Sequence, residues 1–250
     1  MALYDTIGHG YRDLRRPDPR IAARILGALG DATSVVNVGA GAGSYEPVDR
    51  KLIAVEPSGV MVRQRPADAA PVVRASACDL PFRDDAVDAA LAILTLHHWP
   101  DLERGLSELR RVARRRVVVL TFDPSFEGFW LTDYLPEILE IDRRSLPPLS
   151  FLAEQLGGAR IFDVPIPEDC TDGFLAAYWK RPEAYLRPEV RAAISVLTRL
   201  ADPAPGLAAL RRDLDSGDWA RRYGRQLGAT ERDLGYRLLV GDLEASRGVA

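Results

Sequence analysis

Short, mostly apolar runs recur along the first half of the chain, and each ends in glycine or polar residues. The runs cover residues 35–38, 52–55, 71–75, 87–94 and 117–122. Apolar runs of this length are typical of strands buried on both faces of a parallel sheet. Residues 19–29 and 101–114 have apolar positions at helical spacing instead. The pattern therefore predicts an α/β fold.

The two predicted helices carry recognisable start and stop signals. Asp18 is a natural N-cap, Pro19 suits the first turn, and Gly30 suits the end of the first helix. The second helix begins near Asp101, and its last turn is expected to be basic and solvated. The arginines expected in that turn are Arg110, Arg111, Arg114, Arg115 and Arg116.

After residue 122 the pattern becomes more helical and is interrupted by prolines. Helices are predicted over 131–143 and 150–156, followed by a sixth strand over 159–165. Residues 171–227 read as short helices, and residues 234–240 as the last strand.

The first apolar run leads into three glycines, at Gly39, Gly41 and Gly43. Glycine has no Cβ, so a ligand can approach the backbone closely there. A dinucleotide fingerprint would place its third small residue at position 44, and a phosphate-binding P-loop would continue with lysine. The spacing fits neither motif, so the loop predicts a different nucleotide-like ligand at the strand's carboxyl end.

Acidic and imidazole side chains follow the next three runs. Glu56 comes after the second run and can accept the hydroxyls of a ribose, and Asp79 comes after the third and can accept an adenine amine. His97 and His98 follow the fourth. The order of these groups indicates one site at one edge of the sheet.

Together these motifs resemble the class I S-adenosylmethionine (SAM) dependent methyltransferases, in their small-molecule, type 11-like branch. The resemblance rests on residues 36–43, 54–58, 77–82 and 94–99. It implies a doubly wound, Rossmann-like sheet of seven strands, mostly parallel with an antiparallel last strand. It also implies one methyltransferase domain over 1–250, with a helical lid at 1–30 and helical cap insertions at 123–158 and 165–232.

The same resemblance implies which residues hold SAM. The glycines would cradle its methionyl part, Glu56 its ribose and Asp79 its adenine amine, with Met61 or Leu80 against the adenine ring. One departure is Asn37, which stands where the family usually has an acid. The complete expected cofactor set is Asn37, Gly39, Ala40, Gly41, Gly43, Glu56, Pro57, Met61, Asp79, Leu80 and Thr95.

Methyl transfer from SAM needs little from the protein beyond placement, because the sulfonium already activates the methyl group. His97 or His98 could serve as a base for a protonated acceptor. Aromatic side chains from the lid and the first insertion are expected to close the acceptor pocket, and an arginine of residues 3–16 could pair with the SAM carboxylate. The expected acceptor-binding residues are Tyr4, Tyr11, Trp130 and Tyr134.

Composition restricts the partners. The chain has 250 residues, a formal net charge of −3 and two cysteines, so it has no basic field for nucleic acid, no disulfide framework and no metal cluster. No apolar run is long enough to span a bilayer. We expect a cytoplasmic monomer or weak homodimer that acts on a small molecule. A SAM-binding protein that does not methylate and, less favoured, a dinucleotide-dependent oxidoreductase stay open as alternatives.

Overall fold

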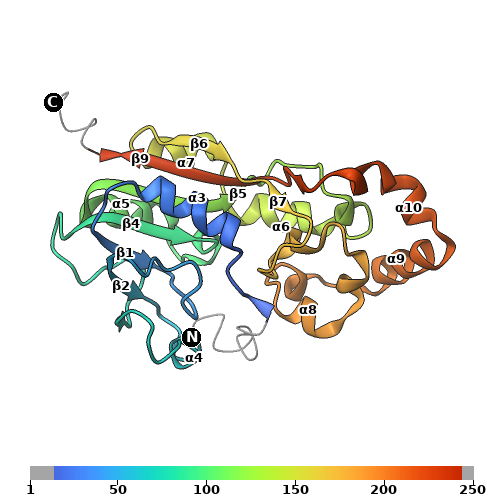
Figure 1. The fold of residues 1–250 in the computed structure, drawn as a ribbon, viewed down its shortest axis with the longest axis horizontal. Helices are drawn as coiled ribbons and strands as arrows, with labels where there is room; N and C mark the ends of the chain where they lie inside the picture. The colour runs from blue at the N-terminus through green and yellow to red at the C-terminus, as the bar shows by residue number, and fades with distance from the viewer. Residues whose placement is uncertain (1–13, 244–250) are drawn as a thin grey trace.

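A seven-stranded sheet organises the protein in a computed structural model that describes residues 14–243 (Figure 1). The strand order is β3-β2-β1-β4-β5-β9-β6. All neighbouring pairs up to β5 are parallel, whereas β9 runs antiparallel to both β5 and β6. The predicted fold class is therefore confirmed. The strands are β1 Ser34–Val38, β2 Lys51–Val55, β3 Val72–Val73, β4 Val87–Ile93, β5 Ala113–Phe122, β6 Arg160–Asp163 and β9 Tyr236–Asp242.

Helices cover both faces of the sheet because successive strand residues point to opposite sides. On one face Val35 packs in the cluster that contains Ile21 and Leu29 of α3 (Pro19–Leu29). On the other, Val36 packs in the cluster of α5 (Leu102–Val112) and α7 (Leu149–Gln155). A strand buried on both faces needs a continuous apolar run, which is what the sequence shows.

Helix α3 begins and ends as predicted. The Asp18 carboxylate accepts a hydrogen bond from the Arg20 N–H at 3.0 Å, and Gly30 leaves the helix with φ of 58°. Its buried face carries Ile21, Ile25 and Leu29. This helix packs on the sheet, so the expected lid over 1–30 does not include it. Residues 1–13 lie outside the described part of the chain.

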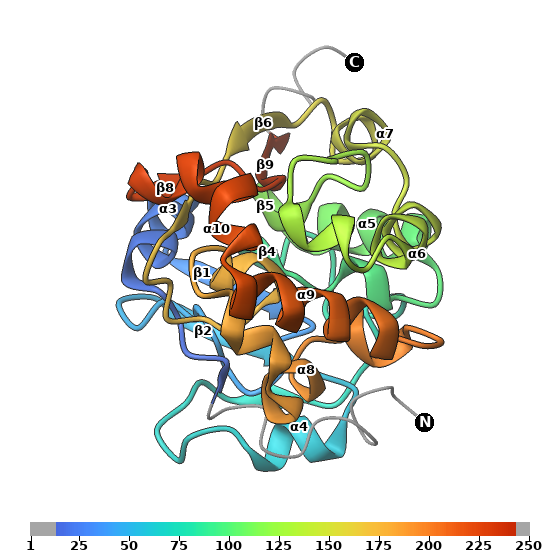
Figure 2. The same ribbon diagram turned by 90° about the vertical axis from the view of Figure 1, so that its right-hand side faces the viewer.

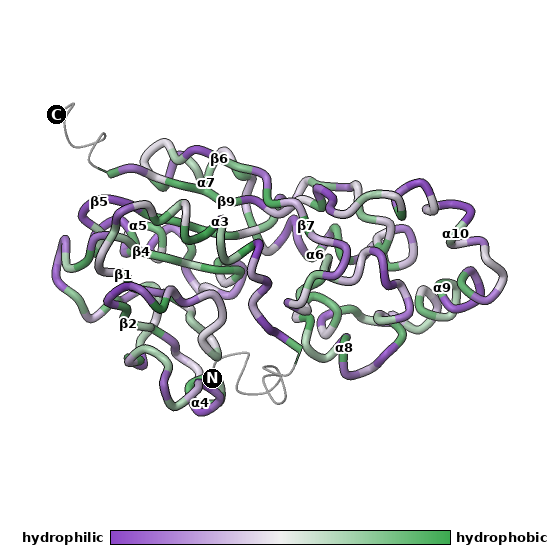
Figure 3. Tube along the Cα trace, viewed as in Figure 1, coloured by the Kyte–Doolittle hydropathy of each residue, from purple (hydrophilic) through white to green (hydrophobic). Residues whose placement is uncertain are grey.

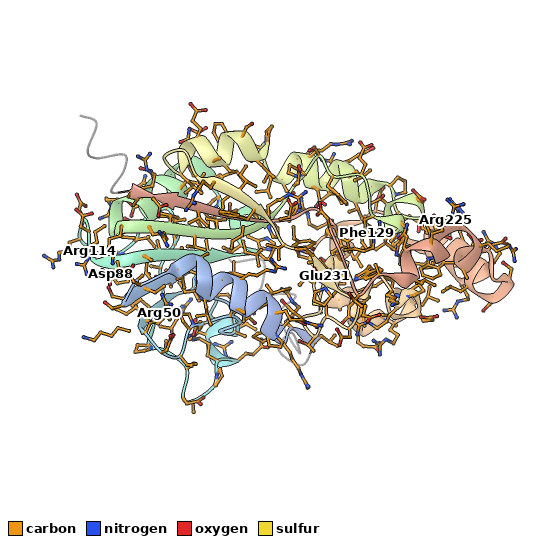
Figure 4. All side chains as sticks on the ribbon, turned by 45° about the horizontal axis from the view of Figure 1, so that its top comes forward. Arg50, Asp88, Arg114, Phe129, Arg225 and Glu231 are labelled. Carbon is orange, nitrogen blue, oxygen red and sulfur yellow. The ribbon has the colours of Figure 1, made fainter. Side chains whose placement is uncertain are left out.

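The basic run at 114–116 is not in a helix, contrary to the prediction. Helix α5 ends at Val112, and β5 begins at Ala113. Each arginine of the run pairs with an acid that is distant in the sequence: Arg114 with Asp88, Arg115 with Asp31 and Arg116 with Asp242. Strand pairing with β4 and β9 extends β5 through these residues. Figure 4 shows Asp88 and Arg114 side by side at the end of the sheet away from the cap.

A helical cap lies beyond the carboxyl ends of the parallel strands (Figure 2). The cap is formed by the segment after β5 and by the longer segment between β6 and β9. Helices α9 and α10 of the longer segment are more hydrophilic than the strands (Figure 3). Helix α7 packs against α5, so the part of the predicted insertion 123–158 that contains it belongs to the sheet layers. The cap also contains a small antiparallel sheet that the sequence did not predict.

The remaining elements are short. They are α4 Gly59–Arg63, η1 Leu96–His98, η2 Trp130–Asp133, α6 Glu137–Ser145, β7 Ile166–Pro167, η3 Leu175–Tyr178, η4 Pro182–Leu186, α8 Pro188–Ala192, η5 Leu197–Arg199, α9 Ala204–Ser216, α10 Asp218–Tyr223, η6 Gly224–Gly228 and β8 Glu231–Arg232.

Candidate functional site

The loop after β1 turns in a conformation that requires glycine. Gly39 and Gly41 have φ of 73° and 53°. The N–H groups of Gly39 and Ala40 both donate to the Val55 carbonyl, at 2.9 and 3.0 Å, which ties the loop to β2. A Cβ on Gly39 would stand 2.1 Å from the Thr95 hydroxyl oxygen. The loop therefore packs directly on the end of β4.

Glu56 joins the loops after β1 and β2. One of its carboxylate oxygens accepts a hydrogen bond from the Gly41 N–H and the other from the Ser58 N–H, both at 2.8 Å. The residue is 5 % exposed. Each carboxylate oxygen can accept a second hydrogen bond, so a ribose hydroxyl can be bound without breaking this arrangement.

Asn37 carries a buried acceptor without a partner. Its amide N–H donates to Glu46 at 3.2 Å, and Arg65 holds the Glu46 carboxylate with two hydrogen bonds of 2.9 and 2.7 Å. The Asn37 Oδ1 atom makes no hydrogen bond within the described chain, although it is buried. Such an atom is costly unless a ligand supplies a donor. The amine of SAM is such a donor, so this position fits the expected cofactor.

These residues surround a cavity of about 420 Å³ at the carboxyl edge of the sheet. Most of the predicted cofactor set lines it. The residues in question are Asn37, Gly39, Ala40, Gly41, Glu56, Pro57, Met61 and Thr95.

Three predicted cofactor residues do not line the cavity. Asp79 is exposed, Leu80 is buried in the core, and Gly43 faces the ion pair of Glu46 and Arg65. Ser76 and Ala77 form the cavity wall instead. Ser76 follows the end of β3 by three positions, which brings it to the same edge of the sheet as Glu56.

A second, narrower cavity of about 80 Å³ adjoins the first beneath the cap. Arg15, Leu94, His97 and Arg199 line both cavities. The second is walled mainly by apolar side chains, and Figure 4 labels one of them, Phe129, in the cap half of the molecule. Its phenylalanines are Phe122, Phe126, Phe129 and Phe174. The sequence reasoning missed these residues, although several belong to the aromatic-rich stretch directly after β5.

The two histidines lie in η1, with ring centroids 3.8 Å apart. Burial, together with His98 and the cations Arg199 and Arg15, lowers the pKa of His97 well below its usual range. Burial lowers the pKa of His98 to about 4. Both rings are therefore neutral near pH 7 and are weak bases. The His97 Nδ1 atom is buried and makes no hydrogen bond within the described chain.

Arg15 connects the amino-terminal segment to the cap and faces both cavities. Its Nε donates to the Asp172 carboxylate at 2.5 Å, and Asp172 is fully buried. The residue belongs to the segment expected to cover the cofactor. The expected pocket residues Tyr4 and Tyr11 lie outside the described chain.

Trp130 and Tyr134 line neither cavity, so the structure corrects the prediction that they hold the acceptor. Trp130 is 2 % exposed, and its indole N–H donates to the Trp179 carbonyl at 2.7 Å. The Tyr134 hydroxyl donates to Asp213 at 2.6 Å. The Trp130 ring packs against Trp219 in the aromatic core of the cap, and the Tyr134 ring packs against Trp130. Long-range partners that local sequence does not reveal draw them into that core.

Residues 14–243 contain neither a metal-binding cluster nor a membrane-spanning helix. No group of three or more histidine, cysteine or acidic side chains there could hold a metal ion. No helix in that range is both long and apolar enough to cross a membrane.

Comparison with known proteins gives one matching family, and three of the similar proteins are informative about this chain. The methyltransferase domain family matches residues 36–121. A crystal structure from Anabaena variabilis, described as a methyltransferase from an antibiotic biosynthesis pathway, is 34 % identical and superposes with a TM-score of 0.84. That match covers 91 % of this chain and 98 % of the Anabaena chain.

The second match is a chloroplastic 2-methyl-6-phytyl-1,4-hydroquinone methyltransferase of Oryza sativa subsp. japonica, 31 % identical over 67 residues. These cover 27 % of this chain and only 19 % of the rice protein. The third is the [4+2]-cyclase SpnF, with 17 % identity, a TM-score of 0.52, and coverage of 95 % and 93 % of the two chains. This last likeness concerns the fold alone.

Proposed function

The chain belongs to the class I SAM-dependent methyltransferases, and we propose that it methylates a small molecule held in the cavity beneath the cap. The observation that carries this proposal is the adjacency of the two cavities. The larger contains the orphaned Asn37 acceptor, the smaller is largely apolar, and His97 lines both. A cofactor in the first would therefore be next to an acceptor in the second.

Each wall of the larger cavity suits one part of SAM. The loop of Gly39 and Gly41 would hold the methionyl group, and Asn37 would accept from its amine. Glu56 would accept from the ribose hydroxyls, and Met61 and Ser76 would contact the adenine. The negative charge that Asn37 lacks is present nearby on Glu46, but Arg65 neutralises it.

Catalysis would depend mainly on placement and exclusion of water. SAM supplies an activated methyl group when bound. The phenylalanine walls exclude water from the acceptor, and alignment in the adjoining cavities can lower the barrier by several kcal/mol. Because the His97 ring is neutral, its proposed role is to orient the acceptor by hydrogen bonding.

Cofactor placement can be tested by calorimetry with S-adenosylhomocysteine. Glu56→Gln should weaken binding about tenfold to a hundredfold, because the amide replaces one oxygen of a carboxylate that makes charge-assisted hydrogen bonds. Asp79→Asn is the matched control and should leave the affinity unchanged. Equal losses in both variants would contradict the assignment.

Methyl transfer itself can be tested with methyl-labelled SAM and a small-molecule extract, followed by chromatography of the labelled products. We expect label in a low-molecular-mass product. Tight cofactor binding without any transfer would favour the non-methylating alternative.

The proposal also includes a cytoplasmic monomer or weak homodimer that does not bind nucleic acid. Two observations support it: both cysteines are free thiols, and the formal net charge is −3. Light scattering and fractionation of cells would test these points.

A further inference from the structure

Asp142 places a carboxyl group in the otherwise largely apolar cavity beneath the cap. It lies in α6, beside the buried Ile138 and Ile141, and lines the same cavity as the phenylalanines. Its carboxylate makes no hydrogen bond or ion pair within residues 14–243. Burial raises its pKa to about 7. A carboxyl group in such surroundings is costly unless something else binds it.

Other acids of the same region have partners, which sets Asp142 apart. The Asp123 carboxylate, in the same cavity, accepts from the Ser125 N–H and hydroxyl at 2.9 and 2.6 Å. Asp213 accepts from Tyr134 at 2.6 Å. Both of these carboxylates are therefore satisfied by hydroxyl or N–H donors, whereas no such donor reaches the Asp142 carboxylate within residues 14–243.

The groups around Asp142 define the ligand that would complete it. His97 of η1 and Tyr236 of β9 line the cavity, and Arg15 and Arg199 stand where the two cavities meet. Asp172 holds Arg15, whereas Arg199 donates to the Ser145 hydroxyl at 3.0 Å. Two cations at this junction disfavour a cationic ligand. The aromatic walls favour a flat apolar body.

We propose that Asp142 selects the methyl acceptor by accepting a hydrogen bond from its hydroxyl group, and that the acceptor is a compact hydroxylated aromatic molecule. This inference rests on the proposed function, in which the cavity beneath the cap holds the acceptor. Asp142 thus acts as a specificity-determining residue. No step of the methyl transfer itself is assigned to it.

The proposal is tested with small probes on protein saturated with S-adenosylhomocysteine. The probes are 4-methylphenol, its methyl ether 4-methylanisole, and benzylamine, with dissociation constants measured by ligand-observed NMR. At about pH 8 we expect the phenol to bind about tenfold or more tightly than the ether, the scale of a hydrogen bond to a charged group. Benzylamine should bind more weakly than the phenol.

Asp142→Leu should remove this preference without changing the affinity for S-adenosylhomocysteine, which also reports that the fold is intact. Asp142→Asn should retain part of it, because the amide oxygen still accepts. Asp123→Asn is the matched control from the same cavity and should retain it fully. The preference should also decline as the pH falls below about 7, where the carboxyl group becomes protonated.

The outcomes separate the two proposals. Failure to bind S-adenosylhomocysteine would contradict the proposed function and with it the acceptor site in the adjoining cavity. Normal cofactor binding with no phenol binding, with equal binding of phenol and ether, or with tighter binding of benzylamine would overturn the role of Asp142. Loss of the preference in Asp123→Asn but not in Asp142→Leu would transfer the role to Asp123.

Discussion

Replacing Asp142 by asparagine should stabilise the protein, and increasingly so as the pH rises. Burial raises the pKa of this carboxyl from 3.8 to about 7 in the folded state. The folded protein therefore holds a proton that the unfolded chain releases. The contribution of Asp142 is most favourable below the unfolded pKa and is lost between the two pKa values. Asparagine has no such titration.

The size of the effect follows from linkage. Each pKa unit corresponds to about 1.4 kcal/mol, so the full loss is about 4 kcal/mol for a group shifted this far. Between about pH 5 and about pH 8 it is about 2–3 kcal/mol.

The assay is urea unfolding of both proteins at these two pH values, with the free energy of unfolding extrapolated to water. On going to the higher pH, the free energy of unfolding of the wild-type protein should fall by about 2–3 kcal/mol more than that of the Asp142→Asn variant. The charged and titratable neighbours His97, Arg199 and Tyr236 are present in both proteins, so their own contribution to the pH dependence largely cancels in this difference. Asp68→Asn, at an exposed site, is the control and should behave like wild type.

A parallel loss in all three proteins would refute the reasoning, because it would mean that Asp142 titrates alike in the folded and unfolded states. A variant less stable than wild type at both pH values would likewise show that the carboxylate makes favourable contacts. Residues kept for function often lower the stability of a protein. A gain in stability on replacing Asp142 is therefore what the proposed recognition role predicts.

Three further outcomes are expected. Gly39→Ala should weaken S-adenosylhomocysteine binding by more than about tenfold in calorimetry, because its Cβ would stand 2.1 Å from the Thr95 hydroxyl oxygen. Gly158→Ala is the control, because Gly158 has the same left-handed backbone but open space around it, and it should leave the affinity unchanged. His97→Gln should retain turnover within about tenfold, and the wild-type rate should show no inflection near about pH 6.5, since the ring is already neutral there. A loss of about a hundredfold or more in the initial rate of the variant would instead indicate that His97 is a base. Arg15→Gln should weaken S-adenosylhomocysteine binding in a salt-dependent way if its guanidinium meets the carboxylate, and salt titrations of wild type and variant compare this directly.

Local signals predicted the sheet and its first helix. The central strands β1 and β4 are short runs buried on both faces, and α3 has its cap at Asp18 and its stop at Gly30. The predicted end of α5 was wrong because contacts with distant residues place the following arginines in β5. Arg115 and Arg116 pair with Asp31 and Asp242, and no local pattern shows that these acids will lie beside β5.

The cofactor half of the site was predictable for a related reason. Asn37, Gly39 and Glu56 lie in a strand or within one residue of its end, so topology alone brings them to one edge. Asp79 follows β3 by six residues, through an irregular loop that carries it to the surface. The acceptor-binding role predicted for the aromatic residues of the cap was wrong because their partners are distant in the sequence. Trp130 packs with Trp219 and Tyr223, residues about ninety positions away whose approach local spacing cannot reveal.

Asp142 is different, because the sequence does contain a signal for it. In a helix, positions three and four apart lie on the same face. Ile138, Ile141 and Asp142 satisfy this spacing, so an acid falls within the apolar stripe of α6. Acids are rarely placed there unless they are paired or have a function. Helical periodicity locates such an exception, and only the tertiary structure shows that this acid faces a cavity rather than a partner.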